Sequence, residues 1–206
     1  MRCLIVGASS QQSIGYHIGE HRKNLGDHVA YASRSCPFGY KLNVADTGAL
    51  QRLFETERPK VVILAVGIAL LSPSFDSLDD WQRQCDDMKA RTEGMLATMI
   101  AANIVGSVTH FIVLGGRERF EDPNLGAYGV SNGGAWGAVQ HAMQHASYKT
   151  NYVNMPYVKG SANAETLARA GLHTGTERAN AISVPKVIQT VDQIMADRVE
   201  PGMVML

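Results

Sequence analysis

Apolar and polar positions alternate along this chain in blocks that predict strands and helices in turn. Short runs rich in valine, isoleucine and leucine recur, and one of them, KVVILAV, has no polar interruption, as expected for a strand buried on both faces. Longer segments between the runs carry apolar residues at helical spacing, such as Met88, Met95 and Met99. The pattern predicts strands over residues 2–6, 28–33, 40–44, 60–66, 109–116, 150–155 and 203–206, and helices over residues 14–25, 46–57, 79–103, 125–147 and 184–197.

The regular alternation of strands and helices predicts an α/β fold. Strands joined by helices pair in parallel through right-handed crossovers, so we expect a Rossmann-type, doubly wound parallel sheet of about seven strands. No domain boundary is visible, and residues 1–206 are predicted to form a single domain. The stretch 157–180 is polar, and residues 165–170 within it are compatible with a short helix.

Composition narrows the class of protein. The chain is 45% hydrophobic and 18% charged, as is ordinary for a globular protein. Lys+Arg and Asp+Glu both total 19, which gives no support to binding of nucleic acid or a membrane surface. Cys3, Cys36 and Cys85 lack metal-ligand spacing and fit reduced thiols in a cytoplasmic protein. The first apolar run is too short for a signal peptide or a membrane span.

A glycine- and serine-rich loop, GASSQQSIG, joins the first predicted strand to the first helix. In that place a sharp turn, hydroxyl groups and the free N–H groups of a helix start can bind a phosphate. Such loops also serve as plain connections, but their position after the first strand of an α/β chain favours nucleotide binding. The candidate cofactor-binding residues here are Gly7, Ser9, Ser10, Ser13, Ile14 and Gly15.

Arg34 directly follows the second predicted strand, where the adenosine ribose of a dinucleotide lies in this kind of fold. An acidic residue there would accept hydrogen bonds from the ribose hydroxyls. A guanidinium group instead suits a 2′-phosphate, which it can bind through two parallel hydrogen bonds. Arg34 therefore favours NADP(H) over NAD(H), although an exposed arginine at a strand end is also common.

The chain resembles the short-chain dehydrogenase/reductase family over nearly its whole length. The features that carry the resemblance are the first strand, the glycine loop, Arg34, Gly67, Tyr128 and Pro156. In that family a tyrosine exchanges a proton with the substrate oxygen, a lysine four residues later binds the nicotinamide ribose, and a serine positions the carbonyl. The resemblance implies that Tyr128 is the catalytic acid. It further implies that residues 1–206 form one NAD(P)-binding domain, in which Gly67 and Pro156 contact the dinucleotide and residues 157–180 form the substrate loop.

Several positions depart from the family pattern. The loop from Gly7 to Gly15 is two residues longer than usual. Asn43 and Val44 stand where the family has Asp-Val beside the adenine, and an asparagine oxygen can still accept from the adenine amine. The strand that normally ends at the catalytic serine ends here at Gly115 and Gly116, which we expect to border the substrate. Candidates to supply the missing group are Arg117, Lys159 and Ser161.

Asn132 replaces the lysine of the family motif. Tyr128 and Asn132 are four residues apart, so they share one face of a helix and could reach the same ribose. An asparagine supplies no positive charge, and an unperturbed tyrosine titrates near ~10, so Tyr128 should be a neutral phenol at neutral pH. It would then serve as an acid in reduction and as a poor base in oxidation.

Two functions follow from these residues. The first is an NADP(H)-dependent reductase of a carbonyl or enoyl group in a small polar substrate, with Tyr128 as proton donor. The second is a catalytically silent relative that binds a dinucleotide as a regulator, sensor or assembly partner. The resemblance also implies a homodimer or homotetramer formed through the helices at 79–103 and 125–147. His141 and His145 share a helix face, but no third ligand is spaced with them, so no metal site is predicted.

Overall fold

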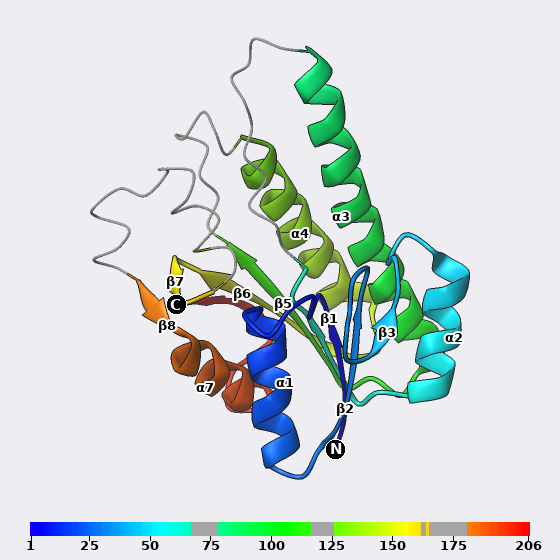
Figure 1. Ribbon diagram of the computed structural model, residues 1–206. Helices are drawn as coiled ribbons and strands as arrows, with labels where there is room; N and C mark the ends of the chain where they lie inside the picture. Colours follow the sequence, from blue (N-terminus) through cyan, green and yellow to red (C-terminus); the bar gives the residue numbers. More distant parts are fainter. Residues whose placement is uncertain (67–77, 117–125, 162–163, 165–180) are drawn as a thin grey trace.

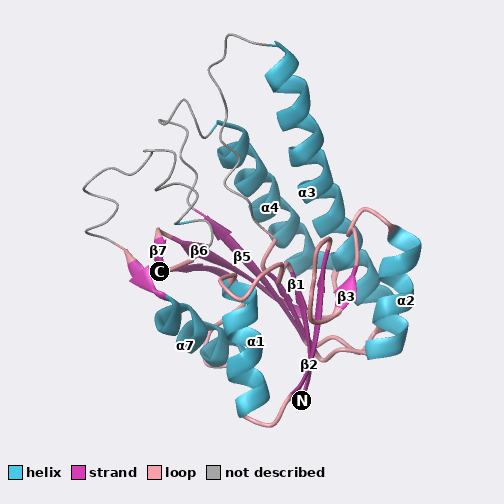
Figure 2. Cartoon of the chain, viewed as in Figure 1, coloured by secondary structure: helices cyan, strands magenta, loops and turns pink. Residues whose placement is uncertain are grey.

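A central sheet covered by helices on both faces dominates the structure (Figures 1 and 2). This computed structural model describes residues 1–66, 78–116, 126–161, 164 and 181–206. Within these residues, seven parallel strands pair in the order β3-β2-β1-β4-β5-β6-β9. They are β1 (Arg2–Val6), β2 (His28–Ser33), β3 (Tyr40–Lys41), β4 (Val61–Leu64), β5 (His110–Gly116), β6 (Lys149–Met155) and β9 (Gly202–Met205). The expected doubly wound parallel sheet is thereby confirmed.

Helices connect the strands and cover the sheet. On one face lie α1 (Ile14–Asn24) and α7 (Val184–Met195), and on the other lie α2 (Thr47–Glu57), α3 (Leu78–Val105) and α4 (Gly126–His145) (Figure 1). Ser13 caps α1 by accepting a hydrogen bond from the Tyr16 N–H at 3.3 Å, and Asp46 caps α2 by accepting from the Ala49 N–H at 2.9 Å. Each cap contributes about 1 kcal/mol to helix stability.

The core has two layers because successive strand residues point to opposite faces of the sheet. Leu4 and Val6 of β1 pack toward α2, α3 and α4, whereas Cys3 and Ile5 pack toward α1 and α7. All four side chains are almost fully buried. A slip of one residue in the pairing would move each of them to the wrong layer, so burial on both faces fixes the register of the sheet.

The strands differ from their predicted bounds in a few places. The strand predicted over 60–66 ends at Leu64, because β1, its neighbour, turns away at Gly7. The strand predicted over 40–44 is only two residues long, since Asn43 starts a turn in which its oxygens accept from the N–H groups of Ala45 and Asp46. A small ribbon of β7 (Val158–Lys159) and β8 (Ile182–Ser183) was not predicted. Residues 165–170 lie outside the described residues.

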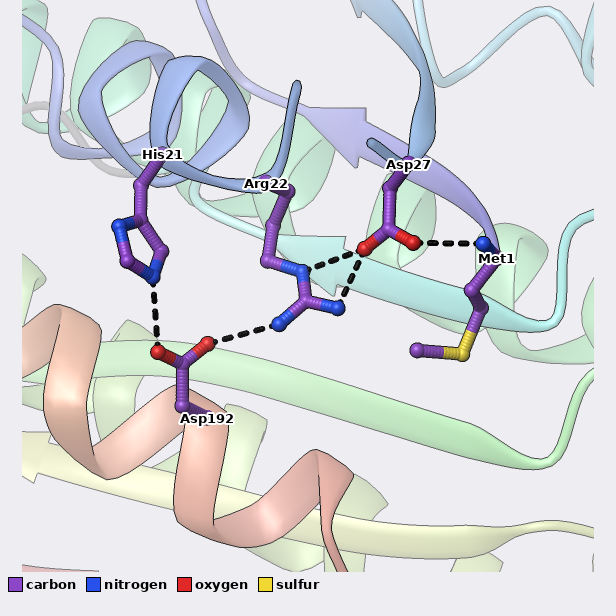
Figure 3. Close-up of polar contacts among 5 residues, drawn as sticks. All are labelled: Met1, His21, Arg22, Asp27 and Asp192. Carbon is purple, nitrogen blue, oxygen red and sulfur yellow. Dashed lines mark hydrogen bonds and ion pairs between the residues drawn. The ribbon is translucent and has the colours of Figure 1, made fainter. Parts of the chain in front are cut away.

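A network of charged side chains joins α1 to α7 at the amino-terminal edge of the sheet (Figure 3). Arg22 donates to Asp27 from Nε at 2.7 Å and to Asp192 from Nη1 at 2.9 Å. His21 contacts the other oxygen of Asp192 at 2.8 Å, and the Met1 ammonium group lies 2.5 Å from Asp27. This network stands at the opposite edge from the candidate site, so we assign it to stability.

Candidate functional site

The carboxyl ends of β1, β2, β4, β5 and β6 meet along one edge of the sheet (Figure 2). From β1 the sheet continues through β2 in one direction and through β4 in the other. Ligands of open α/β sheets bind beyond the carboxyl ends of the strands, at the point where the strand order reverses. The loop after β1 lies at that point.

Gly7 begins the loop with a left-handed backbone. Its φ is +109°, a conformation that residues with a side chain rarely adopt. A Cβ built on Gly7 would stand 2.5 Å from the carbonyl carbon of Ala65, at the end of β4. The Ser9 N–H donates to the Gly7 carbonyl at 3.2 Å and closes the first turn. The sharp turn that the sequence predicts here is therefore present, and its cause is close approach to the neighbouring backbone.

Ser13 organises the second half of the loop. Its hydroxyl donates to the Ser10 carbonyl at 2.7 Å and accepts from the Tyr16 N–H, so it holds the loop and caps the helix. The helix begins at Ile14, and the first N–H groups of a helix have no carbonyl partner within it. Gly15 is buried, and a Cβ there would lie 3.0 Å from Cγ2 of Ile5. This close packing places the positive end of the helix dipole directly at the end of β1.

Arg34 lies at the end of β2, beside this loop. The preceding residue, Ser33, donates from its hydroxyl to the Ala8 carbonyl at 3.3 Å and so links the strand end to the loop. Arg34 itself is exposed, and it forms no hydrogen bond or ion pair with another residue that the structure describes. Its guanidinium group is thus available to a ligand bound at the loop.

Asn43 and Val44, the residues expected beside the adenine, both make contacts within the protein. Asn43 is exposed, and its side-chain oxygen accepts from the Ala45 N–H at 3.2 Å. Val44 is half-buried and packs against α3 at Gly94, where a Cβ would be 2.3 Å from its Cγ2. An adenine amine would therefore share the Asn43 oxygen with a turn. Gly67 lies outside the described residues.

Asn132 brings α4 to the end of β5. Its side chain is 1% exposed, and its Oδ1 lies 3.5 Å from the Gly116 nitrogen, which donates to it. Tyr128 lies in the first turn of α4, but its side chain is outside the part that the structure describes. The helix thus positions Asn132 against Gly116, the last residue of β5.

A cavity of ≈ 10 Å³ lies beneath this edge, between the sheet and the helices α3 and α4. It is lined in part by Val66, Thr92, Met95, Gly115 and Ser131. This volume is about that of one water molecule, so the cavity does not itself hold a cofactor or substrate. It nevertheless shows that packing is incomplete where the carboxyl ends of β4 and β5 meet α4.

Two candidates for the missing catalytic group, Lys159 and Ser161, lie shortly after β6. Pro156, expected to contact the dinucleotide, is half-buried immediately after the same strand. Lys159 is exposed on β7, and Ser161 is buried, where its hydroxyl accepts from the Ala164 N–H at 3.2 Å. Ser161 therefore holds a turn. Arg117 lies outside the described residues.

Tyr152 is a residue of this edge that the sequence did not single out. This residue of β6 is 2% exposed, and its ring packs against Trp136 of α4 with the ring centres 5.9 Å apart. Its hydroxyl donates to the Gly116 carbonyl at 3.2 Å. The signal in the sequence was the pair of adjacent glycines at the end of β5, which can mean that a bulky side chain from a neighbouring strand occupies the space. The register of β5 on β6, which identifies that neighbour, is not visible in the sequence.

A metal site needs several ligating side chains close together, and a membrane span needs a long apolar helix. Both can be judged in the part of the chain that the structure describes. In it, no three histidine, cysteine, aspartate or glutamate residues come together as metal ligands would. The rings of His141 and His145 lie 4.5 Å apart, and both residues are exposed. None of the described helices combines the length and the apolar character that a membrane crossing needs.

Comparison with known proteins finds the fold of this chain among solved structures. No family model matches the sequence, and no curated protein matches it. Solved structures do match. Aldohexose dehydrogenase of Thermoplasma acidophilum superposes with a TM-score of 0.78 at 14% identity, over 100% of this chain and 92% of that one. The chain has a fold of the short-chain dehydrogenase/reductase type.

Two further neighbours act on sugar nucleotides or bind them. MoeE5 in complex with UDP-glucose and NAD has a TM-score of 0.76 at 16% identity, over 100% of this chain and 76% of MoeE5. UDP-glucose 4-epimerase of Thermotoga maritima with UDP-glucose has a TM-score of 0.73 at 16% identity, again over 100% of this chain and 76% of the epimerase. Identities this low establish a shared fold, so the function of this chain has to be argued from its own residues.

Proposed function

We propose that this protein is an NADP(H)-dependent reductase of a carbonyl or enoyl group. The observation that carries the proposal is the loop from Gly7 to Gly15, which sets the free N–H groups of α1 at the strand-order reversal beside the exposed Arg34. This arrangement suits a pyrophosphate at the helix start and a 2′-phosphate at Arg34. Structural neighbours that are complexes with NAD support the choice of a nicotinamide dinucleotide.

The chemistry assigned to each residue follows from its charge and place. When bound, the nicotinamide supplies a hydride to the substrate carbon. Tyr128 donates the proton that the substrate then takes up, and Asn132 holds the end of β5 and the ribose side of the site. Because Asn132 carries no charge, reduction is the favoured direction. The short polar stretch 157–180 suits a small polar substrate.

A second candidate is a silent dinucleotide-binding protein that acts as a regulator, sensor or assembly partner. What favours it is the end of β5, where Gly115 and Gly116 supply no hydroxyl, together with the uncharged Asn132. Such a protein would bind NADPH and oxidise none. Turnover therefore separates the two candidates.

Both candidates are tested first by titration of nicotinamide fluorescence with NADPH and with NADH. We expect NADPH to bind more tightly, and Arg34→Ala to weaken NADPH while leaving NADH unchanged. Arg198→Ala is the matched control, since Arg198 is also exposed but follows α7 at the opposite edge of the sheet. Absence of binding by either dinucleotide would refute both candidates.

We also propose that the protein forms a homodimer or homotetramer through α3 and α4. The two helices lie side by side (Figure 1). A Cβ built on Gly134 of α4 would lie 3.4 Å from Cγ2 of Thr92 on α3. Leu96, Ile100 and Ile104 recur every four residues on α3 and are 44%, 59% and 67% exposed. A contiguous apolar stripe of this kind is typical of an interface.

A further inference from the structure

Tyr152 occupies the space that a side chain at Gly115 would fill. Gly115 is the last residue but one of β5, and Tyr152 lies on β6, the adjacent strand. A Cβ built on Gly115 would lie 1.9 Å from the Tyr152 hydroxyl oxygen and 2.1 Å from its Cζ. A serine hydroxyl at position 115 would be one covalent bond from that Cβ. The phenol oxygen therefore stands almost where such a serine would place its own.

The Tyr152 hydroxyl contacts the end of β5. It donates to the Gly116 carbonyl at 3.2 Å, beyond the 2.5–3.0 Å that is usual for a hydroxyl donor. The backbone N–H of Gly116 donates to the side-chain oxygen of Asn132 on α4. A phenol from β6 and an amide from α4 thus converge on one glycine at the carboxyl end of β5.

Resting on the reductase function proposed above, we propose that Tyr152 is the group that binds the substrate oxygen at this strand end. In the family pattern a serine has this role, and β5 here offers only glycines. The hydroxyl would transfer its hydrogen bond from the Gly116 carbonyl to the substrate oxygen. No covalent bond changes at Tyr152, since the hydride comes from NADPH and the proton from Tyr128. Gly115 is required because the phenol needs its space.

Tyr148 provides the comparison within the same chain. It is also a buried phenol on the α3 and α4 face, 6% exposed, and its hydroxyl donates to the Met99 carbonyl at 2.9 Å. Burial raises the pKa of Tyr148 to about 12. Tyr148 precedes β6 at the amino-terminal edge of the sheet, away from Gly115. Removing its hydroxyl should affect stability and leave the site intact.

The test compares Tyr152→Phe with Tyr148→Phe, since each change removes one hydroxyl and keeps the ring. NADPH affinity is measured by nicotinamide fluorescence, and NADPH oxidation is followed with diacetyl, a small α-diketone, as the probe. We expect Tyr152→Phe to lower kcat by about a hundredfold, the usual effect of losing one oxygen-binding donor, with NADPH affinity unchanged. Tyr148→Phe should keep the wild-type kcat. Equal kcat for wild type and Tyr152→Phe would overturn the proposal.

A rescue experiment separates a hydroxyl requirement from a packing requirement. Tyr152→Ala removes the phenol, and Gly115→Ser in the same chain then has room for a serine hydroxyl at the strand end. We expect the double variant to be at least tenfold faster than Tyr152→Ala alone, an effect that packing would not produce. A double variant no faster than Tyr152→Ala would count against the proposal.

The outcome for the wild-type protein distinguishes this proposal from the function on which it rests. NADPH binding without oxidation by diacetyl would overturn the role of Tyr152 together with the reductase activity, and leave dinucleotide binding standing. Oxidation that survives Tyr152→Phe at full rate would overturn the role of Tyr152 alone.

Discussion

Gly7 and Ala65 approach so closely that no side chain fits between them. The Cβ of any other residue at position 7 would stand 2.5 Å from the Ala65 carbonyl carbon and 2.6 Å from its oxygen. The contact joins the loop after β1 to the end of β4, so the candidate phosphate site is built on two strands at once. A loop fixed in this way is already arranged for a ligand before the ligand binds.

Gly7→Ala is therefore expected to damage both stability and binding. The left-handed backbone alone costs on the order of 1–3 kcal/mol with a side chain, and the contact with Ala65 adds to it. Gly26→Ala is the control, because Gly26 has a φ of +85° with nothing within 4 Å of its Cβ position. Thermal unfolding should show a larger loss for Gly7→Ala, and NADPH titration should show weaker binding for that variant only. Equal losses would mean that the contact is unimportant.

Asn132→Lys is expected to raise the rate of NADPH oxidation. A lysine would restore the positive charge that the family places four residues after its tyrosine, and an oriented charge at a developing oxyanion is worth about a hundredfold in rate. Asn132 is buried at the start of α4, so the size of the new side chain must be controlled. Asn132→Met has similar length and no charge. Steady-state kinetics in which both variants behave alike would show that charge has no role at this position.

The sequence was sufficient for most of the fold, because its signals there are local. The run KVVILAV is buried on both faces, and Asp46 caps α2 where the pattern placed a helix start. Both properties depend on residues that are neighbours along the chain. The strand order and the two layers of the core then follow from general rules about parallel sheets.

The site was less predictable, because its contacts join distant residues. The Ser13 hydroxyl caps α1 and bonds to the Ser10 carbonyl, two contacts that the loop sequence alone did not predict. Tyr152 meets Gly115 only through the pairing of β5 with β6, 37 positions apart in the sequence. Spacing within one helix could place Asn132 near a ribose, but only the folded chain shows that it accepts from the Gly116 nitrogen.

Asp27 is expected to make stability depend on pH in the acid range. Burial alone would raise the pKa of Asp27, but hydrogen bonds from the Met1 ammonium group and from Arg22 bring it below its ordinary value. A carboxylate with a lowered pKa stabilises the fold above the unfolded pKa of about 3.9, and this contribution is lost as the pH falls through the folded pKa. At pH 7, Asp27→Asn should cost about 2–3 kcal/mol in denaturant unfolding.

The difference between wild type and Asp27→Asn should shrink as the pH is lowered from neutral to about 3, because the wild-type carboxylate then takes up a proton. Asp46→Asn is the control: Asp46 is an exposed helix cap, and asparagine caps helices about as well as aspartate. A difference that stays constant with pH would show that the ion pairs with Met1 and Arg22 are not the source of the stability.

Thr150→Val is expected to leave the protein as stable or to stabilise it by about 1 kcal/mol. Thr150 is fully buried in β6, and its hydroxyl has no hydrogen-bond partner among the described residues. Valine has nearly the same shape and removes a polar group that is costly to bury. Thr98→Val is the matched control, since the fully buried Thr98 hydroxyl donates to the Gly94 carbonyl at 2.6 Å. That variant should lose about 1 kcal/mol, and equal effects in denaturant unfolding would contradict this account.

Ile100→Glu is expected to convert the proposed homo-oligomer to a monomer. A charge placed in the apolar stripe of α3 would be desolvated in an interface, which costs several kcal/mol, whereas it is harmless on an exposed surface. Leu25→Glu is the control, because Leu25 is 58% exposed at the end of α1, on the other face of the sheet. Sedimentation velocity should show a monomer for Ile100→Glu and the wild-type assembly for Leu25→Glu, with both variants folded by circular dichroism. A wild-type protein that sediments as a monomer would remove the interface, while a variant that keeps the wild-type assembly would place the contact on another surface.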